Sequence, residues 1–250
     1  MQLGTVATQR VTRVTKSVHP PAPPRLPDTS QVLMDYYQAM LARLGPRHWW
    51  PAKTRFEVIA GAILTQNTAW SNASRALDNL RRKCLLVPAA MERVSMARLA
   101  RLIRPSGYFR QKARKLKAFM AFLRREYGGS LSRMFRAPTR ELRQKLLGIH
   151  GIGPETADSI LLYAGSHSIF VVDAYTRRIL ERHQLLHVGA SYDEIQEFFE
   201  GSLPHDVRLY NEYHALIVNV GKEWCRAREP RCADCPLRGY LPQDPSGMTL

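Results

Sequence analysis

The sequence predicts an all-α fold, and three features of the chain support this prediction. Apolar residues recur at helical spacing from residue 28 onward, and helix-capping residues stand ahead of several of these runs. Only residues 168–172 have the composition of a strand, and a single strand of that length cannot form a sheet. The chain has 250 residues, 45% of them hydrophobic, which is enough to bury the core of one large or two small domains. This composition excludes a disordered or fibrous protein.

The chain begins with a basic segment at residues 1–28. It has no acidic residue before Asp28, and prolines crowd its end. We expect a disordered, proline-rich tail, because such a segment cannot bury enough apolar surface to fold. The tail either adds non-specific phosphate contacts or is an extension of no consequence.

The first predicted helix follows this tail. Asp28 can cap its start, and Gly45 with Pro46 ends it. A longer helix is expected over residues 112–127, where apolar positions fall on one face. Those positions are Leu116, Phe119, Met120 and Leu123.

Two further helix starts have the spacing of a capping box. Thr54 is followed three residues later by Glu57 and then by an apolar helical pattern. Ser191 and Glu194 repeat the arrangement. We therefore expect helices to begin just after Thr54 and just after Ser191.

Residues 140–165 are the most informative part of the sequence. One predicted helix ends in a glycine-rich turn, and a second begins at Pro154, a residue favoured in the first turn of a helix. Gly151 and Gly153 have no Cβ, so a phosphate can approach the backbone near the free N–H groups and positive dipole end of the second helix. The segment is predicted to bind a phosphodiester without reading sequence. The alternative is an ordinary tight turn between helices.

This segment resembles the helix-hairpin-helix motif of the endonuclease III family of base-excision DNA glycosylases. The resemblance continues to Asp173, where that family places its catalytic aspartate, and to residues 64–68. In the second segment, Gln66 matches the glutamine that fills the gap left by a flipped nucleotide, and Asn67 stands beside it. With Thr156 of the hairpin, these residues are candidate DNA contacts.

The resemblance implies a particular fold. A six-helix barrel domain is expected over residues 49–170, with the hairpin inside it. Residues 29–48 and 171–250 would form a second, discontinuous helical domain that carries a cysteine loop. DNA would lie across the cleft between the two domains.

The hairpin departs from the bifunctional members of the family, which place a lysine where this chain has Glu155. A carboxylate cannot form an imine, so lyase chemistry through this residue is excluded and a monofunctional glycosylase is predicted. Asp173 is expected to stabilise an oxocarbenium-like sugar and to orient or deprotonate water. The alternative, which its position about 20 residues after the hairpin disfavours, is that Asp173 only caps a helix over residues 174–182; both roles can coexist. Asp173 and Glu155 are the candidate catalytic residues.

Three of the four tryptophans lie near the predicted DNA-reading segment. Trp49 and Trp50 precede Pro51, and Trp70 follows residues 66–69. Flat, electron-rich indoles can sandwich a flipped base and attract a cationic alkylated purine. Together with Glu155, these residues look most like the 3-methyladenine DNA glycosylase branch of the family. The alternative for Trp49 and Trp50 is a role as structural anchors.

The formal charge of +16 suggests a nucleic-acid partner. We expect a monomer that binds double-stranded DNA containing damaged bases. Seven basic residues between 101 and 117 have no acid among them, and those near Gly107 could contact phosphates while others are solvated.

No run approaches the ~18 apolar residues of a spanning helix, and no secretion signal is recognisable. We therefore expect an intracellular, soluble protein without a membrane partner, cytoplasmic and nucleoid-associated as in bacteria.

Three cysteines cluster near the C-terminus, which indicates a metal site more than a disulfide framework. Cys225, Cys232 and Cys235 match the first three positions of the family's iron–sulfur loop, and Leu241 stands at the fourth. A [4Fe–4S] cluster normally takes four thiolates. A cluster with one other ligand, a three-cysteine zinc site and an empty loop therefore stay open. His205 and Asp244 are possible fourth ligands, and a monovalent cation at the hairpin is a further expectation.

Two other functions compete with an alkylpurine glycosylase. The hairpin and Asp173 would also serve a glycosylase for oxidised or mismatched pyrimidines. Only the tryptophans distinguish an alkylpurine glycosylase from this alternative. A catalytically silent protein that binds damaged DNA is the alternative from another class.

Overall fold

The computed structural model describes residues 28–47, 49 and 52–242, and every regular element in these ranges is helical, as predicted. Residues 168–172, the strand-like segment, are extended but form no sheet. The predicted tail up to residue 27, Trp50, Pro51 and Asp244 lie outside the described residues. Within the described part, no helix is both long and apolar enough to span a bilayer.

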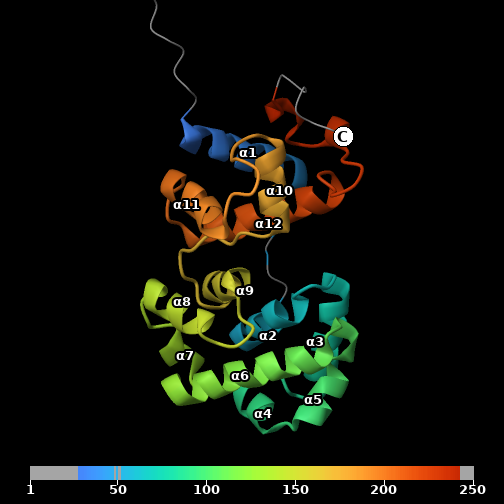
Figure 1. Ribbon diagram of the computed structural model, residues 1–250, viewed down its shortest axis with the longest axis vertical. Helices are drawn as coiled ribbons and strands as arrows, with labels where there is room; N and C mark the ends of the chain where they lie inside the picture. Colours follow the sequence, from blue (N-terminus) through green and yellow to red (C-terminus); the bar gives the residue numbers. More distant parts are fainter. Residues whose placement is uncertain (1–27, 48, 50–51, 243–250) are drawn as a thin grey trace, which may run out of the picture.

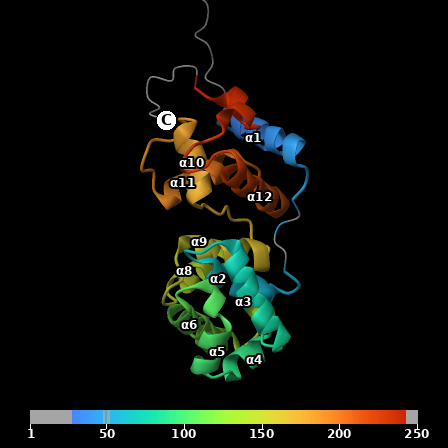
Figure 2. The same cartoon turned by 90° about the vertical axis from the view of Figure 1, so that its right-hand side faces the viewer.

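The helices form two groups, one above the other in Figures 1 and 2. The upper lobe contains α1 (Thr29–Leu44), α10 (Ala174–Arg182), α11 (Tyr192–Ser202) and α12 (Val207–Glu223). The lower lobe begins with α2 (Arg55–Thr65), α3 (Trp70–Arg82), α4 (Pro88–Arg93), α5 (Met96–Leu102) and η1 (Arg104–Ser106). It continues with α6 (Phe109–Tyr127), α7 (Leu131–Met134), α8 (Thr139–Leu147), α9 (Pro154–Ser159) and η2 (Ile160–Ala164). The N-terminal helix thus joins the C-terminal helices, although the predicted domain boundaries themselves stay predictions.

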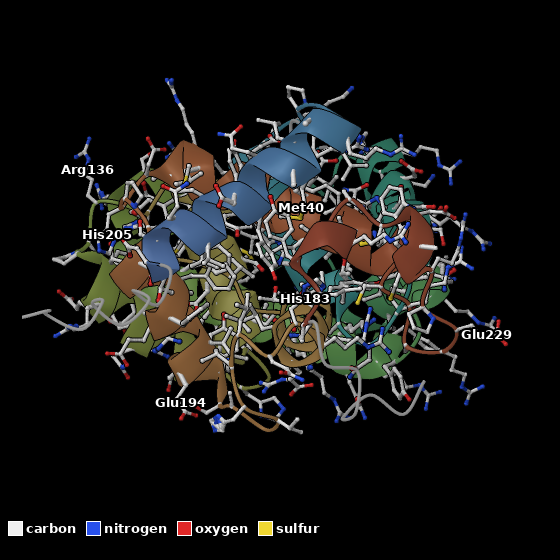
Figure 3. All side chains as sticks on the ribbon, turned by 90° about the horizontal axis from the view of Figure 1, so that it is seen from above. Met40, Arg136, His183, Glu194, His205 and Glu229 are labelled. Atoms are coloured by element: carbon white, nitrogen blue, oxygen red, sulfur yellow. The ribbon has the colours of Figure 1, made fainter. Side chains whose placement is uncertain are left out.

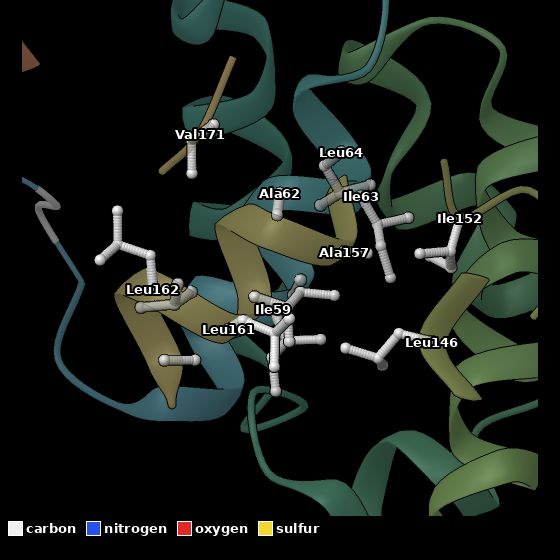
Figure 4. Close-up of a cluster of buried hydrophobic side chains, with 14 of the residues drawn as sticks. Ile59, Ala62, Ile63, Leu64, Leu146, Ile152, Ala157, Leu161, Leu162 and Val171 are labelled. Atoms are coloured by element: carbon white, nitrogen blue, oxygen red, sulfur yellow. The ribbon is translucent and has the colours of Figure 1, made fainter. Parts of the chain in front are cut away.

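Helix α2 forms the centre of the lower lobe because it is apolar on nearly every side. All residues from Phe56 to Leu64 are buried. Figure 4 shows Ile59 and Ile63 of α2 beside Ala157 and Leu161 of the second hairpin helix. This packing fixes the end of α2, and therefore the turn that carries Gln66, against the hairpin.

The buried side chains of the upper lobe pack beneath α1 and belong to the same hydrophobic core cluster as those of the lower lobe. Met40 is fully buried, and the hydroxyl of Tyr36 lies 2.8 Å from Nδ1 of His183 at the end of α10. In Figure 3 Met40 and His183 lie near the centre of the view from above, whereas Glu194 and Glu229 lie at its edge.

In the lower lobe, the predicted apolar face of α6 is also buried, at Leu116, Phe119, Met120 and Leu123.

The predicted caps are present, with one difference. Asp28 caps α1 and Ser191 with Glu194 forms a complete capping box. Thr54 accepts the N–H of Glu57, but the Glu57 carboxylate accepts from the N–H of Lys53 and binds Arg81. The ion pair with Arg81 draws the carboxylate away from the Thr54 N–H, so the box at Thr54 is incomplete.

The second hairpin helix also differs from the expected regular α-helix. It begins at Pro154 as predicted, but residues 160–164 form a π-helix in which the N–H of Gly165 donates to Ile160 O over 3.1 Å. A π-turn widens the helix by one residue and often occurs at functional sites. Here it carries Tyr163, whose hydroxyl bonds to His214 of the upper lobe.

Candidate active site at the hairpin

A cavity of about 530 Å³ opens between the two lobes next to the hairpin. The turn between α2 and α3 lines it, as do residues of α9, the start of α10 and one face of α12. The predicted site residues that it brings together are Trp49, Gln66, Asn67, Trp70, Glu155, Thr156 and Asp173. Segments distant in the sequence therefore meet in one pocket.

Asp173 uses its two carboxylate oxygens differently. Oδ1 accepts from the N–H of Tyr175 at 2.9 Å, the N–H of Thr176 at 2.8 Å and the Thr176 hydroxyl at 3.0 Å. Oδ2 lies 3.6 Å from Nε2 of His214. One oxygen caps α10, over the predicted residues 174–182, and leaves the other beside the cavity.

The environment of Asp173 lowers the pKa of its carboxyl group. Burial alone would raise this pKa, but the contact with His214 and the bonds from Thr176 outweigh it. The pKa of Glu155 is raised, first by the surrounding protein and then by the Asp173 charge, although this residue is open to solvent at the rim of the cavity. The two carboxylates therefore differ: Asp173 is the more readily ionised.

Gln66 is bound to the hairpin. Its Nε2 donates to Gly151 O at 3.1 Å and to Thr156 Oγ1 at 2.9 Å, while Nζ of Lys115 donates to its Oε1. The adjacent Asn67 is exposed and has a φ of 50°. Asparagine tolerates this left-handed conformation better than most residues, which suits the sharp turn between α2 and α3.

The two hairpin glycines have different surroundings. Gly151 has a φ of 81°, and a Cβ there would approach the side chain of Lys115 to 2.5 Å. Gly153 has an extended conformation, and a Cβ on it would meet no atom within 4 Å. Only Gly151 is required by the fold itself, while Gly153 leaves open space over the start of α9.

Trp49 and Trp70 flank this cavity. Trp49 lies in the segment that joins the lobes, and Trp70 is the first residue of α3. Nζ of Lys222 on α12 is 5.6 Å from the centre of the Trp49 ring. The ring of Trp49 thus already attracts a cation.

His214 and Lys222 lie outside the motifs considered in the sequence, whereas Lys115 belongs to the basic run between residues 101 and 117. His214 and Lys222 are eight residues apart, hence on one face of α12, a regularity that could have been noticed. The basic run on α6 is less solvated than expected. Nζ of Lys112 donates to Leu64 O at 2.9 Å and Ser106 O at 2.6 Å, and burial lowers its pKa to about 8.

The cysteine loop forms a separate cavity of about 840 Å³ in the upper lobe. Cys225, Cys232 and Cys235 line it, and so does Leu241. The donor set is therefore one thiolate short of a [4Fe–4S] site, and no three His, Cys, Asp or Glu residues in the described ranges are arranged to hold a metal ion. His205 lies elsewhere, 3.5 Å from the hydroxyl of Tyr210. The iron–sulfur and hairpin-cation predictions stay predictions.

Two helices, α8 and α9, joined by a glycine-rich turn at residues 148–153 place the protein in the helix-hairpin-helix class, and α9 lines the interlobe pocket together with Asp173. Comparison with known families gives the particular family. The model of the HhH-GPD superfamily of base excision DNA repair proteins matches residues 60–205, and the chain belongs to this family.

Individual relatives agree with this assignment. The chain is 45% identical over 212 residues to a protein of Methanocaldococcus jannaschii named provisionally as a DNA repair glycosylase, covering 84% of this chain and 92% of that protein. Endonuclease III of Sulfolobus acidocaldarius is 29% identical over 75% of this chain and 82% of its own length.

Solved structures show the same fold. A 3-methyladenine DNA glycosylase of H. pylori, in a crystal structure with 1,N6-ethenoadenine, superposes with a TM-score of 0.68 at 28% identity, over 78% of this chain and 98% of that one. An endonuclease III in a trapped covalent DNA complex has a TM-score of 0.73 at 22% identity, over 85% of this chain and 95% of that one.

Proposed function

We propose that this base excision DNA repair protein is a monofunctional glycosylase that hydrolyses the N-glycosidic bond of a flipped, alkylated purine of the 3-methyladenine type. The observation that carries this proposal is the pair of carboxylates in the cavity. Glu155 stands where bifunctional relatives place an amine, and it faces Asp173 beside Trp49 and Trp70. The similarity to the 3-methyladenine glycosylase of H. pylori supports the choice of base.

Asp173 would act on the sugar. The C1′–N bond breaks with its electron pair passing to the purine, so a cationic alkylated base leaves neutral. Oδ2 stabilises the developing positive charge on the sugar ring and accepts a proton from the water whose oxygen bonds to C1′. The proton then passes to solvent, and an intact abasic site is left.

The aromatic walls would select the base. The indole of Trp49 attracts the ammonium of Lys222, so it would also attract a purine that carries a positive charge. A cationic purine is in addition a good leaving group. A strong general acid is therefore not required in this pocket.

Double-stranded DNA with damaged bases is the proposed partner of a monomeric enzyme. The start of α9 with the open space over Gly153 suits a phosphate, and Gln66 stands where it could enter the duplex once it leaves the hairpin.

A glycosylase for oxidised or mismatched pyrimidines is the second candidate, favoured by the relationship to endonuclease III of Sulfolobus acidocaldarius. The experiment that separates the candidates presents duplexes with 3-methyladenine, 7-methylguanine, uracil, thymine glycol or a G·T mismatch. Base release is measured directly, and strand breaks are measured before and after alkali. Release of methylated purines with breaks only after alkali is expected.

Three other results would contradict the proposal. Release of pyrimidines alone would support the second candidate. Breaks without alkali would show lyase chemistry despite Glu155. Tight binding without release of any base would indicate a catalytically silent protein.

No step of this reaction uses the cysteine loop. An iron–sulfur cluster in this loop is a separate proposal that rests on the three thiols sharing one cavity. Iron and sulfide analysis with the visible spectrum of anaerobically purified protein tests it. Colourless, iron-free protein would end that proposal.

A further inference from the structure

His214 lies between the two lobes, with a hydrogen-bond partner at Nδ1 and a carboxylate oxygen near Nε2. It projects from α12 and is 6% exposed. The hydroxyl of Tyr163 bonds to Nδ1, and Oδ2 of Asp173 lies 3.6 Å from Nε2. Nε2 is buried and has no hydrogen-bond partner among the described residues, so its closest polar neighbour across the cavity is the Asp173 carboxylate.

The π-turn of the hairpin helix places the partner at Nδ1. Tyr163 belongs to η2, where the wider turn replaces the regular helix. Burial raises the pKa of Tyr163 well above its ordinary value, so the hydroxyl keeps its proton. It can therefore donate to Nδ1 of His214 whenever the imidazole is neutral.

The carboxylate at the other nitrogen determines where the ring proton resides. An ionised carboxylate only accepts hydrogen bonds, and a bare Nε2 lone pair facing Oδ2 would be repelled. With Tyr163 donating to Nδ1, the neutral ring carries its proton on Nε2. In the doubly protonated ring Nε2 also carries one, so both forms of His214 direct an N–H at Asp173.

The hydrogen bonds of Asp173 within α10 restrain only one of its two carboxylate oxygens. Three bonds within α10 hold Oδ1, and none of them restrains or compensates Oδ2. The groups that face this carboxylate from the packed elements are Glu155 of α9, Tyr163 of η2, Tyr175 of α10 and His214 of α12. Glu155 carries the same charge as Asp173, so of these four groups His214 is the one that favours an ionised Asp173.

We propose that His214, oriented by Tyr163, is a positioning residue that holds Oδ2 of Asp173 toward the sugar and keeps it ionised beside Glu155. The inference deepens the proposed glycosylase function and rests on it. His214 would touch neither base nor sugar and would act through Asp173.

The first test follows base release from methylated duplex under single-turnover conditions as a function of pH. We expect His214→Gln to slow release by about ten- to a hundredfold at neutral pH and to move the acidic limb of the profile to higher pH. Tyr163→Phe should move the limb in the same direction by less. Tyr210→Phe is the matched control, because its hydroxyl faces His205 outside the cavity.

If the acidic limb of the pH profile lies at the wild-type pH in both His214→Gln and Tyr163→Phe, the proposal is overturned. Melting temperatures of all variants identify any that do not fold, and Tyr163→Phe then carries the test alone.

The second test does not depend on activity. The imidazole resonances of His214 are compared by NMR between the wild-type protein and Asp173→Asn at one pH. Loss of the carboxylate should shift the Nε2 resonance of His214, because Oδ2 lies 3.6 Å from this nitrogen. An unchanged Nε2 resonance would overturn the pairing, whereas a shifted resonance in a protein that releases no base would support the pairing and reject only the proposed function.

Discussion

At the scale of single residues, Asp173 combines a structural and a chemical position in one side chain. Its Oδ1 satisfies two N–H groups at the start of α10, and its Oδ2 borders the cavity. The sequence left open whether Asp173 caps a helix or serves a reaction, and the separate surroundings of the two oxygens allow both. An amide at this position would retain the cap and lose the charge.

We expect Asp173→Asn to reduce base release by about 10²- to 10⁴-fold, the usual contribution of a positioned acid–base group, with DNA binding retained. Single-turnover rates and binding isotherms measure the two effects. Asp206→Asn is the control, since Asp206 caps α12 through the N–H groups of Arg208 and Leu209. An equal loss in the control would show that capping, not chemistry, accounts for the effect.

The lowered pKa of Asp173 also predicts a pH dependence of stability. A carboxyl group whose pKa is lower in the folded than in the unfolded protein stabilises the fold above its unfolded pKa, and this contribution is lost as pH falls through the folded value. The melting temperature of Asp173→Asn should therefore lie below that of wild type at pH 7, and the two should converge in acid. A gap that stays constant down to pH 3 would contradict the assignment.

At the scale of elements, the hairpin shows that two glycines of one motif can have different roles. Gly151 combines a positive φ with close contact to Lys115, whereas Gly153 has neither. Sequence spacing treats both as phosphate contacts. The structure assigns the first to the turn and leaves the second facing open space.

Replacement by alanine should separate these roles. Gly151→Ala is expected to destabilise the protein by about 1–3 kcal/mol, because the added methyl group displaces the Lys115 side chain and strains the backbone. Gly153→Ala should leave the free energy of unfolding within about 0.5 kcal/mol and weaken DNA binding. Denaturant unfolding and binding isotherms would measure both, and equal stability of the two variants would reject the distinction.

At the scale of the whole molecule, one buried network ties the lobes together. Asp158 of α9 is fully buried and accepts from Arg143 of α8 at 2.8 Å, from the Tyr192 hydroxyl at 2.8 Å and from Gln196 at 2.9 Å. Gln196 also donates to Phe170 O in the segment that leads to Asp173. Residues of α8 and α9 in the lower lobe are thus bound to α11 in the upper one.

Asp158→Ala should destabilise the protein by about 3–5 kcal/mol, because it removes the buried carboxylate of Arg143 and leaves this largely buried side chain with the exposed Asp193 as its ion-pair partner. In denaturant unfolding, the midpoint of Asp158→Ala should lie below that of the wild-type protein. Asp78→Ala removes an exposed partner of Arg81 and should cost no more than about 1 kcal/mol. If the two variants lost equal stability, the network would not be what holds the lobes.

The sequence by itself determined the helical class, the Asp28 and Ser191 caps, the start of the second hairpin helix at Pro154 and the helix that follows Asp173. These features depend on neighbours a few residues away, so local spacing and residue type are sufficient to predict them. Local spacing predicted neither the incomplete box at Thr54 nor the π-turn before Gly165, and the residues that bond to Glu57 and Tyr163 there, Arg81 and His214, lie on other helices.

Only the tertiary structure decided how the site is assembled. His214 and Lys222 reach the cavity from α12, where the sequence indicated no site residue, and Gln66 is bound by a lysine of α6. Such contacts depend on how apolar faces pack across the lobes, a property of the whole chain and not of any short segment. The same packing places Leu241 with the three cysteines and leaves that set one thiolate short.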